Sequence, residues 1–504
     1  MNIIKSIFTR LNISIAVILL QISIIIRLVT TVVNHMPIVI GVSYFISIAI
    51  ILWLVIKDQS SGIKITWILV VIALPISGVV LYLLFGNQYP PKKTRKKLTA
   101  EHEELRKLLK VKSRFHTPIV GITDYIKNAG GFRAYQDTKS TYYPLGKDFF
   151  ADMIEHLKKA EKFIFMEYFI IEEGTLWDEI YEVLKYKASG GVEIRIIFDD
   201  LISQRLFTNK YEINMWSKQI KTLRYNPIQI VFHPFMNYRN HRKLTVIDGK
   251  IAYTGAANIT DPSVYPTEKF GVWKDTGIKL EGTAVWSFTL MFIEIWNSFS
   301  RTSDRINNHM DYKAKKIKVD EPSGLVMPYG DSPFSKERIG ENVYIYILNT
   351  AKDYVYIMSP FLIISEKMIY AMQMAVKRGV DVRIILPGKY EWKRAMVQRV
   401  SRSYYKYLSK SGVKIYEDKA GYLHAKSFVS DDKIAVVGTM NLDYRSLYLH
   451  FECAVLLYKT DSIQAVKEDT LNTLKTSNEM KHNPKERLGS QFADAIIHIF
   501  APLM

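Results

Sequence analysis

The stretch GGVEIRII, residues 190–197, recurs as RGVDVRII, residues 378–385, with five of eight positions identical. Each copy has the composition of a buried strand, and each follows a strand-like run and a segment of helical periodicity. The preceding runs are KFIFMEYFII at 162–171 with a helix at 175–188, and YVYIMSPFLI at 354–363 with a helix at 366–378. Alternating strands and helices indicate an α/β fold. Two copies indicate a duplicated fold, with a shared site expected at the interface between the halves.

A polar motif with identical spacing, H-x-K-x4-D-x6-G-x2-N, follows each copy. Its members are His241, Lys243, Asp248 and Asn258 in the first half, and His424, Lys426, Asp431 and Asn441 in the second. The segments HRKLTVI and HAKSFVS look like strands, so histidine and lysine would project from one face. The pairs Asp248-Gly249 and Asp431-Asp432 are typical of a tight hairpin turn. We expect both aspartates to hold this turn and its lysine rather than to transfer protons.

These residue types suit displacement at a phosphodiester. One imidazole can attack phosphorus near neutral pH, and a second can protonate the departing alkoxide. The two lysines would supply positive charge to the non-bridging phosphate oxygens. Asn258 and Asn441 would donate hydrogen bonds to the same oxygens. A metal site is the alternative use of the histidines, but the motif offers a lysine instead of further ligands, and no H-E-x-x-H or paired-cysteine pattern occurs. The sequence therefore predicts a reaction without metal or other cofactor.

The composition indicates an anionic partner. The 504 residues include 68 Lys and Arg against 49 Asp and Glu, a formal net charge of +19, which favours phospholipid headgroups or nucleic acid. The single cysteine, Cys453, excludes a disulfide-stapled secreted module. It lies in an apolar run and is expected to be a buried hydrophobic residue.

The amino-terminal region is apolar enough to enter a membrane. Residues 65–85 (ITWILVVIALPISGVVLYLLF) and 37–56 carry no charge, and each could cross the hydrocarbon layer as a helix. Pro75 is tolerated in transmembrane helices. Residues 11–33, interrupted by Arg27, are expected to form a third span or an interfacial helix. The basic run PPKKTRKKL then predicts a multi-pass protein of the cell membrane whose downstream catalytic region lies on the cytoplasmic face.

The duplicated motif resembles the HKD signature of the phospholipase D superfamily, and a closer resemblance to bacterial cardiolipin synthases covers nearly the whole chain. It includes the apolar amino terminus and, in the first half, YPLGKDFF, IIFDDL, NHRKLTVIDGKIAYTGAANITD and WKDTGIKLEG. The second half adds RGVDVRIILPGK, SRSYYKYL, SGVKIYE, YLHAKSFVSDDKIAVVGTMNLDYRS and FE. Ala256 departs from the superfamily pattern, which often has a hydroxyl residue there, whereas Thr439 keeps it. The resemblance implies a duplicated phospholipase D fold, two similar α/β halves sharing one active site, preceded by transmembrane helices.

The resemblance also implies a reaction. One phosphatidylglycerol would be attacked to give a phosphatidyl-histidine and glycerol, and a second would then take up the phosphatidyl group to give cardiolipin. In well-studied members of the superfamily the amino-terminal histidine is usually the nucleophile, which implies His241 as nucleophile and His424 as general acid and base. An acid downstream of each motif would orient its histidine: Asp275 would serve His241, and Glu452 would serve His424.

We expect four parts: a membrane region with two or three hydrophobic helices (1–90), a basic linker (91–130), and two phospholipase D-like halves (131–320 and 321–504). The expected partners are phosphatidylglycerol and other anionic phospholipids of the membrane, without nucleic acid. A membrane-bound phospholipase D hydrolase would use the same residues with water as acceptor. A membrane-tethered nuclease of the superfamily would use the positive charge but would not need the apolar spans. A non-enzymatic scaffold should have lost a histidine or lysine, and both motifs are complete.

Overall fold

The computed structural model describes residues 37–57, 59–86, 92–109, 119–227, 234–268, 271–314, 324–335, 337–389, 395–480 and 497–503, with isolated positions between 19 and 31. The chain forms two compact units, which are described separately. One comprises Met1–Lys92, Asn226–Tyr238 and Arg487–Met504, and the other comprises Lys93–Tyr225 and Arg239–Glu486. The second unit contains both copies of the repeat.

The first half of this unit is built on a seven-stranded sheet with the order β1-β9-β7-β6-β2-β3-β4. Strands β2, β3 and β4 are parallel and are joined by crossover helices, whereas the remaining neighbours are antiparallel. The strands are β1 (Thr138–Tyr143), β2 (Phe163–Tyr168), β3 (Glu193–Asp199), β4 (Ile220–Tyr225), β6 (Lys243–Ile247), β7 (Ile251–Gly255) and β9 (Gly277–Gly282).

The second half repeats the first strand for strand. Its order is β10-β17-β16-β15-β11-β12-β13, with β18 added at the edge, and β11, β12 and β13 are again parallel. The strands are β10 (Leu325–Asp331), β11 (Tyr354–Met358), β12 (Asp381–Pro387), β13 (Lys414–Asp418), β15 (Ser427–Ser430), β16 (Ile434–Gly438), β17 (His450–Tyr458) and β18 (Ser477–Glu479). The expected duplicated α/β fold is confirmed.

Two short strand pairs connect the halves. Strand β5 (Arg239–Asn240) pairs in parallel with the start of β17, and β8 (Val272–Lys274) pairs in parallel with β14 (Gly421–Leu423). Each pair joins a strand of one half to a strand of the other. These are the contacts that place the two motifs together.

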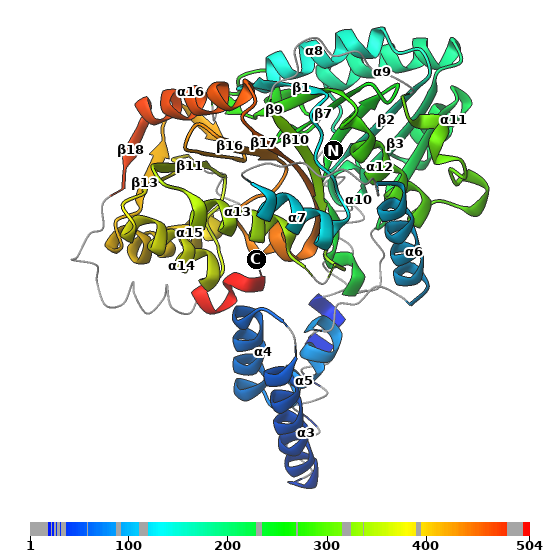
Figure 1. Cartoon of the computed structure of the whole chain (residues 1–504). Helices are drawn as coiled ribbons and strands as arrows, with labels where there is room; N and C mark the ends of the chain where they lie inside the picture. The colour runs from blue at the N-terminus through cyan, green and yellow to red at the C-terminus, as the bar shows by residue number, and fades with distance from the viewer. Residues whose placement is uncertain are drawn as a thin grey trace. The chain divides into compact units, whose positions relative to one another are not determined.

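Helices cover the sheets, as Figure 1 shows for α8 and α9 over the first one. Between the sheets, α12 is buried along nearly its whole length and contacts β2 and β6 of the first half and β10 of the second. Helix α16 contacts β1 as well as the second sheet. The helices of this unit are α6 (Lys92–Leu109), α7 (Val120–Gly130), α8 (Gly146–Lys158), α9 (Thr175–Ser189), α10 (Asp200–Ser203), α11 (Asn209–Ser217), α12 (Val285–Phe299), α13 (Ile339–Thr350), α14 (Glu366–Lys377), α15 (Ala395–Lys410) and α16 (Ser462–Lys475), with short turns η3 (Asp261–Ser263), η4 (Thr302–Asp304), η5 (His309–Tyr312) and η7 (Arg445–Leu449).

Both predicted hairpin turns are present, between β6 and β7 and between β15 and β16. The φ angles are +53° at Asp248 and +65° at Gly249, and +53° at Asp431 and +55° at Asp432. Positive φ at both central residues is the geometry whose twist matches the flanking strands, and glycine and aspartate tolerate it best.

The other unit contains α3 (Pro37–Ile56), α4 (Ser61–Ala73), α5 (Ser77–Leu81) and the π-turn η1 (Tyr82–Gly86). The expectation of one continuous helix over 65–85 is wrong, because α4 ends before Pro75, whose ring removes a backbone donor and clashes with the preceding turn. The carbonyl of Pro75 instead accepts a hydrogen bond from Ser47 Oγ of α3 at 2.9 Å.

The expected transmembrane spans are not seen as such. Among the described residues, no helix is both long enough and apolar enough to cross a membrane. Most of the third expected segment, 11–33, lies outside the described residues.

Candidate active site

The motif histidines lie in short loops that lead into the central hairpins. His241 stands between β5 and β6, and His424 between β14 and β15. The strands therefore begin after the histidines and not at them. The lysines curl back, so that Lys243 Nζ donates to the carbonyl of His241 at 2.8 Å, and Lys426 Nζ donates to that of His424 at 2.6 Å.

Each motif histidine is hydrogen-bonded to a carboxylate of the other half. His241 Nδ1 donates to Glu452 Oε1 and Oε2 at 2.8 and 3.0 Å, and His424 Nδ1 donates to Asp275 Oδ1 at 2.6 Å. The expected assignment, Asp275 to His241 and Glu452 to His424, is therefore wrong. The sequence identified the two acids but exchanged their partners.

The strand pairs between the halves cause this exchange. In the β5–β17 pair, the backbone N–H of His241 donates to the carbonyl of Phe451 at 2.9 Å. In the β8–β14 pair, the N–H of His424 donates to the carbonyl of Lys274 at 3.0 Å. Phe451 and Lys274 each directly precede an acid in the sequence, so each pairing sets a histidine beside the other half's carboxylate.

Hydroxyl groups hold both acids in place. Glu452 also accepts hydrogen bonds from Ser446 Oγ, at 2.6 Å, and from Thr439 Oγ1. Asp275 accepts one from Ser263 Oγ at 2.7 Å. Sequence reasoning missed both serines, because no local pattern marks them. Ser263 supplies the hydroxyl to Asp275, whereas the first-half counterpart of Thr439 is Ala256.

The hydrogen bonds define the protonation of the imidazoles. An ionised carboxylate can only accept, so Nδ1 of each histidine carries a proton, and attack or proton transfer is left to Nε2. Burial, together with Lys243, Lys426 and His424, holds the pKa of His241 well below its usual range. The imidazole of His241 is therefore neutral near pH 7 and can attack or accept a proton through Nε2.

The lysines form a buried positive site. Burial is the main cause that lowers the pKa of Lys243 to about 8, against the opposing charges of Glu452 and Asp275. Burial and the neighbouring Lys243 hold the pKa of Lys426 well below its usual range. Two buried lysines whose pKa values are lowered are a binding place for an anion, because an anion favours the charged form of both.

The motif asparagines are buried directly after the returning strands. Oδ1 of Asn258 and Oδ1 of Asn441 have no hydrogen-bond partner within the described part of the chain. A buried amide atom without a partner is costly, which favours a ligand as the missing partner. Since an amide has a similar shape in either orientation, each side chain can also present its NH₂ group to a phosphate oxygen.

The motif aspartates serve the fold. Asp248 accepts hydrogen bonds from the backbone N–H groups of residues 161, 162 and 163, at 2.8 to 2.9 Å. Asp431 does the same for residues 352, 353 and 354, at 2.8 to 3.0 Å. They hold the turn as expected and tie it to the entry of β2 or β11. The lysines are held instead by the histidine carbonyls.

Substitution Asp248→Ala should therefore lower the free energy of unfolding by about 2–4 kcal/mol, because three N–H groups, one of them buried, lose their acceptor and alanine disfavours positive φ. Asp248→Asn keeps one acceptor oxygen and tolerates the turn, so it should lose less. Denaturant unfolding of both variants in detergent tests this. A marked loss of turnover per folded molecule in Asp248→Asn would contradict a structural role.

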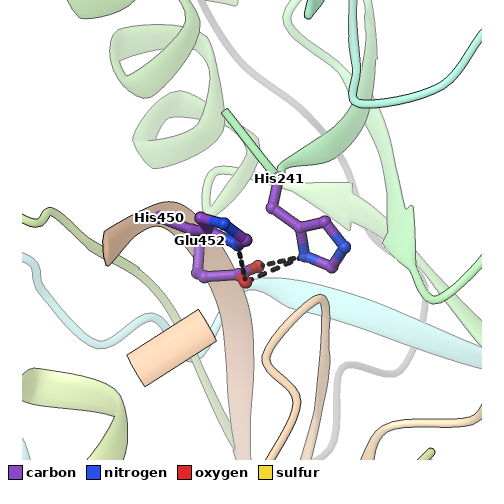
Figure 2. Close-up of side chains that lie close together, drawn as sticks. All are labelled: His241, His450 and Glu452. Atoms are coloured by element: carbon purple, nitrogen blue, oxygen red, sulfur yellow. Dashed lines mark hydrogen bonds and ion pairs between the residues drawn. The ribbon is translucent and has the colours of Figure 1, made fainter. Parts of the chain in front are cut away.

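A third histidine lies against the first pair. His450 begins β17, and its ring centroid is 5.4 Å from that of His241. Its Nδ1 lies 3.8 Å from Glu452 Oε1, beyond hydrogen-bond distance (Figure 2). Sequence reasoning missed it, although its position two residues before Glu452 in a strand places both side chains on one face.

Comparisons with known proteins identify the family of this chain. A family model described as "Cardiolipin synthase, PLD-like domain" matches residues 153–279 and 344–473, and one described as "Phospholipase_D-nuclease N-terminal" matches residues 45–87. An uncharacterized protein of Streptococcus mutans is 40% identical over 90% of this chain and 99% of its own length. Cardiolipin synthase 1 of Bacillus anthracis is 29% identical over 92% of this chain and 94% of its own.

A crystal structure of phosphatidylserine synthase from Haemophilus influenzae has the same fold, with a TM-score of 0.56, at 14% identity over 77% of this chain and 98% of its own. The family model covers half of the chain and matches both halves of the duplicated sheet. The chain therefore belongs to the phospholipase D superfamily, in the family of cardiolipin synthase PLD-like domains.

Proposed function

We propose that this protein is a cardiolipin synthase, which transfers the phosphatidyl group of one phosphatidylglycerol to another and releases glycerol. The observation that carries the proposal is the pair of buried histidine–carboxylate contacts, each formed across the two halves. This arrangement provides one neutral imidazole, His241, for attack and a second, carboxylate-bound imidazole, His424, for proton transfer, both beside two lysines. The relatives named cardiolipin synthase support the choice of substrate.

In the first step, His241 Nε2 attacks phosphorus and forms a P–N bond while the P–O bond to the glycerol headgroup breaks. His424 gives a proton to the departing glycerol oxygen. The Lys243 and Lys426 ammonium groups, with the asparagine amides, stabilise the charge on the non-bridging oxygens. Glu452 stabilises the positive charge that His241 gains. His424 enters this step protonated at both nitrogens, and the anion of Asp275 favours that form.

In the second step, neutral His424 takes the proton from the terminal hydroxyl of a second phosphatidylglycerol. The oxygen attacks phosphorus, the P–N bond breaks, and cardiolipin forms with His241 restored. Hydrolysis is the competing second candidate, because water could replace the lipid alcohol. The burial of both histidines favours an acceptor delivered by the lipid over bulk water.

The rate should depend on pH through groups whose pKa values are shifted. Asp275 has its pKa raised to about 6 by burial, so it takes up a proton as the pH falls through 6 and no longer supports protonated His424. Lys243 has its pKa lowered to about 8, so its charge is lost as the pH rises through 8. We expect a bell-shaped kcat/KM between these limits. In the pH profile of kcat, the loss of activity at high pH should occur at a higher pH than in kcat/KM. The reason is that the bound phosphodiester stabilises the ammonium form of Lys243. An unchanged kcat/KM well above pH 8 would contradict this role of Lys243.

We also propose that the amino-terminal unit attaches the enzyme to the membrane, with the catalytic unit on the cytoplasmic side. The "Phospholipase_D-nuclease N-terminal" match covers residues 45–87, and large apolar side chains of α3, among them Phe45, Leu52 and Ile56, are exposed. The start of α6 carries a basic cluster, Lys92, Lys93, Arg95, Lys96 and Lys97, that suits anionic headgroups. We also keep, as part of this proposal, the division of the chain into a membrane region, a basic linker and two phospholipase D-like halves, with boundaries after residues 90, 130 and 320.

The function is tested by incubating the purified full-length chain with phosphatidylglycerol vesicles and weighing the products by mass spectrometry. Cardiolipin with an equal amount of free glycerol is the expected result. Phosphatidic acid as the main product would show the hydrolase instead. Nucleic-acid cleavage without any lipid product would show the nuclease.

A further inference from the structure

His450, which the mechanism above does not use, is a buried imidazole at the start of β17. Its side chain is 8% exposed, and neither Nδ1 nor Nε2 has a hydrogen-bond partner among the described residues. Unsatisfied buried polar atoms cost about 1–3 kcal/mol each. The ring nitrogens of His450, beside His241 and Glu452, are therefore available to bind a ligand.

Its neighbours define what it can bind. One potential ligand atom from each of His241, His450 and Glu452 can be chosen so that all lie within 4.8 Å of one another, and all three side chains are buried. Figure 2 shows the two rings on either side of the carboxylate. Two imidazoles and one carboxylate form a donor set that proteins use for zinc, whereas magnesium and calcium prefer oxygen ligands.

We propose that His241, His450 and Glu452 form a binding site for a divalent transition-metal ion such as Zn²⁺, and that its occupation inhibits the enzyme. Bonds of about 2.0–2.1 Å in a tetrahedral zinc site separate neighbouring ligand atoms by about 3.3 Å. The distances from Glu452 Oε1 to Nδ1 of His241 and of His450 are 2.8 and 3.8 Å. Side-chain shifts of about half an ångström would bring these two contacts to that separation, and the ligand nitrogens of the two histidines, which lie within 4.8 Å of each other, would have to approach as well.

Inhibition follows from the proton on His241. A metal ion bound at Nδ1 displaces the proton that Nδ1 shares with Glu452, and in the neutral ring this proton moves to Nε2. Nε2 then has no lone pair for attack on phosphorus. The ion would also bind the Glu452 carboxylate, which then could not stabilise the positive charge on the His241 ring. The metal is therefore an inhibitor and not a cofactor, and a chelator should restore activity.

Metal binding is tested without lipid, so this arm does not depend on the proposed function. The untagged full-length chain in zwitterionic detergent is titrated with Co²⁺, whose visible absorption is intense only in four- or five-coordinate sites. We expect this absorption to saturate at one ion per chain, and to be displaced by Zn²⁺ but not by Mg²⁺. The variant is His450→Phe, which keeps an aromatic ring against His241. The matched control is His309→Phe, which removes a histidine of η5 outside the cluster.

His450→Phe should abolish the Co²⁺ absorption, and His309→Phe should retain it. Loss of a second-shell partner weakens metal binding by about 10- to 100-fold, so loss of a direct ligand should cost at least as much. Absence of the absorption in the unaltered protein, or an identical spectrum in folded His450→Phe, would overturn the proposal.

The inhibition arm rests on the proposed function. Zn²⁺ should stop cardiolipin formation from phosphatidylglycerol, a chelator should restore it, and His450→Phe should need at least about tenfold more Zn²⁺ for the same inhibition. Equal sensitivity of His450→Phe and the unaltered enzyme would refute an inhibitory site at this cluster. Co²⁺ binding lost in His450→Phe, with no cardiolipin formed by any variant, would support the metal site and refute the proposed function.

Discussion

Replacing either His241 or His424 with alanine should reduce cardiolipin synthesis at least about a thousandfold. His241→Ala removes the only group that the mechanism gives to attack on phosphorus. His424→Ala removes the proton donor of the first step and the base of the second. Since each histidine is needed for every turnover, either single variant should lose nearly all activity, and the double variant should lose little more.

The measurement is the initial rate of cardiolipin formation from phosphatidylglycerol vesicles, normalised to folded protein. His309→Ala is the control, because it removes an imidazole in η5 that belongs to neither motif. Appreciable turnover by either motif variant would show that one half of the molecule acts alone. A single site shared by both halves would then be excluded.

The exchanged acids lead to the second large effect. Glu452→Gln and Asp275→Asn should each slow synthesis by about 10²–10⁴-fold, since an amide no longer fixes the proton on Nδ1 or stabilises the charged ring. Their defects should differ in kind. Glu452 contacts the attacking His241, whereas Asp275 contacts the proton donor His424.

A substrate with a good leaving group separates the two defects. An activated phosphatidyl ester of an electron-poor phenol needs no protonation of its leaving group. Release of the phenol should be largely restored in Asp275→Asn but remain slow in Glu452→Gln. The opposite pattern would mean that Asp275 serves His241, as the sequence alone suggested, or that the histidine roles are reversed. Equal rescue of both variants would contradict any division of labour between the acids.

The local elements were predictable because they depend on short patterns. The repeated strand–helix–strand order and the aspartate turns follow from side-chain periodicity and from positive φ, and both were confirmed. The partners of Asp275 and Glu452 were not predictable. They depend on the β5–β17 and β8–β14 pairs, which join residues about two hundred and one hundred and fifty positions apart.

Two further features, the helix break at Pro75 and the position of His450, could not be predicted from the sequence for other reasons. The apolar run at 65–85 looked like one continuous helix because hydropathy depends only on how apolar the side chains are. It does not show that Pro75 lacks a backbone N–H donor and that its ring clashes with the preceding helical turn. His450 was overlooked because a histidine in an apolar strand carries no motif. Its meaning appears only when the β5–β17 pair brings His241 to its side.

The most direct test of a covalent intermediate shared by the two halves is to locate the adduct. His241→Ala and His424→Ala are each mixed with the activated phosphatidyl ester, quenched in alkaline denaturant, in which the phosphorus–nitrogen bond survives, and digested for mass spectrometry. A phosphatidyl group on His241 in the His424→Ala variant, with none in His241→Ala, is the predicted result. An adduct on His424 in the His241→Ala variant would reverse the two roles, and no histidine adduct in either variant would contradict the covalent mechanism.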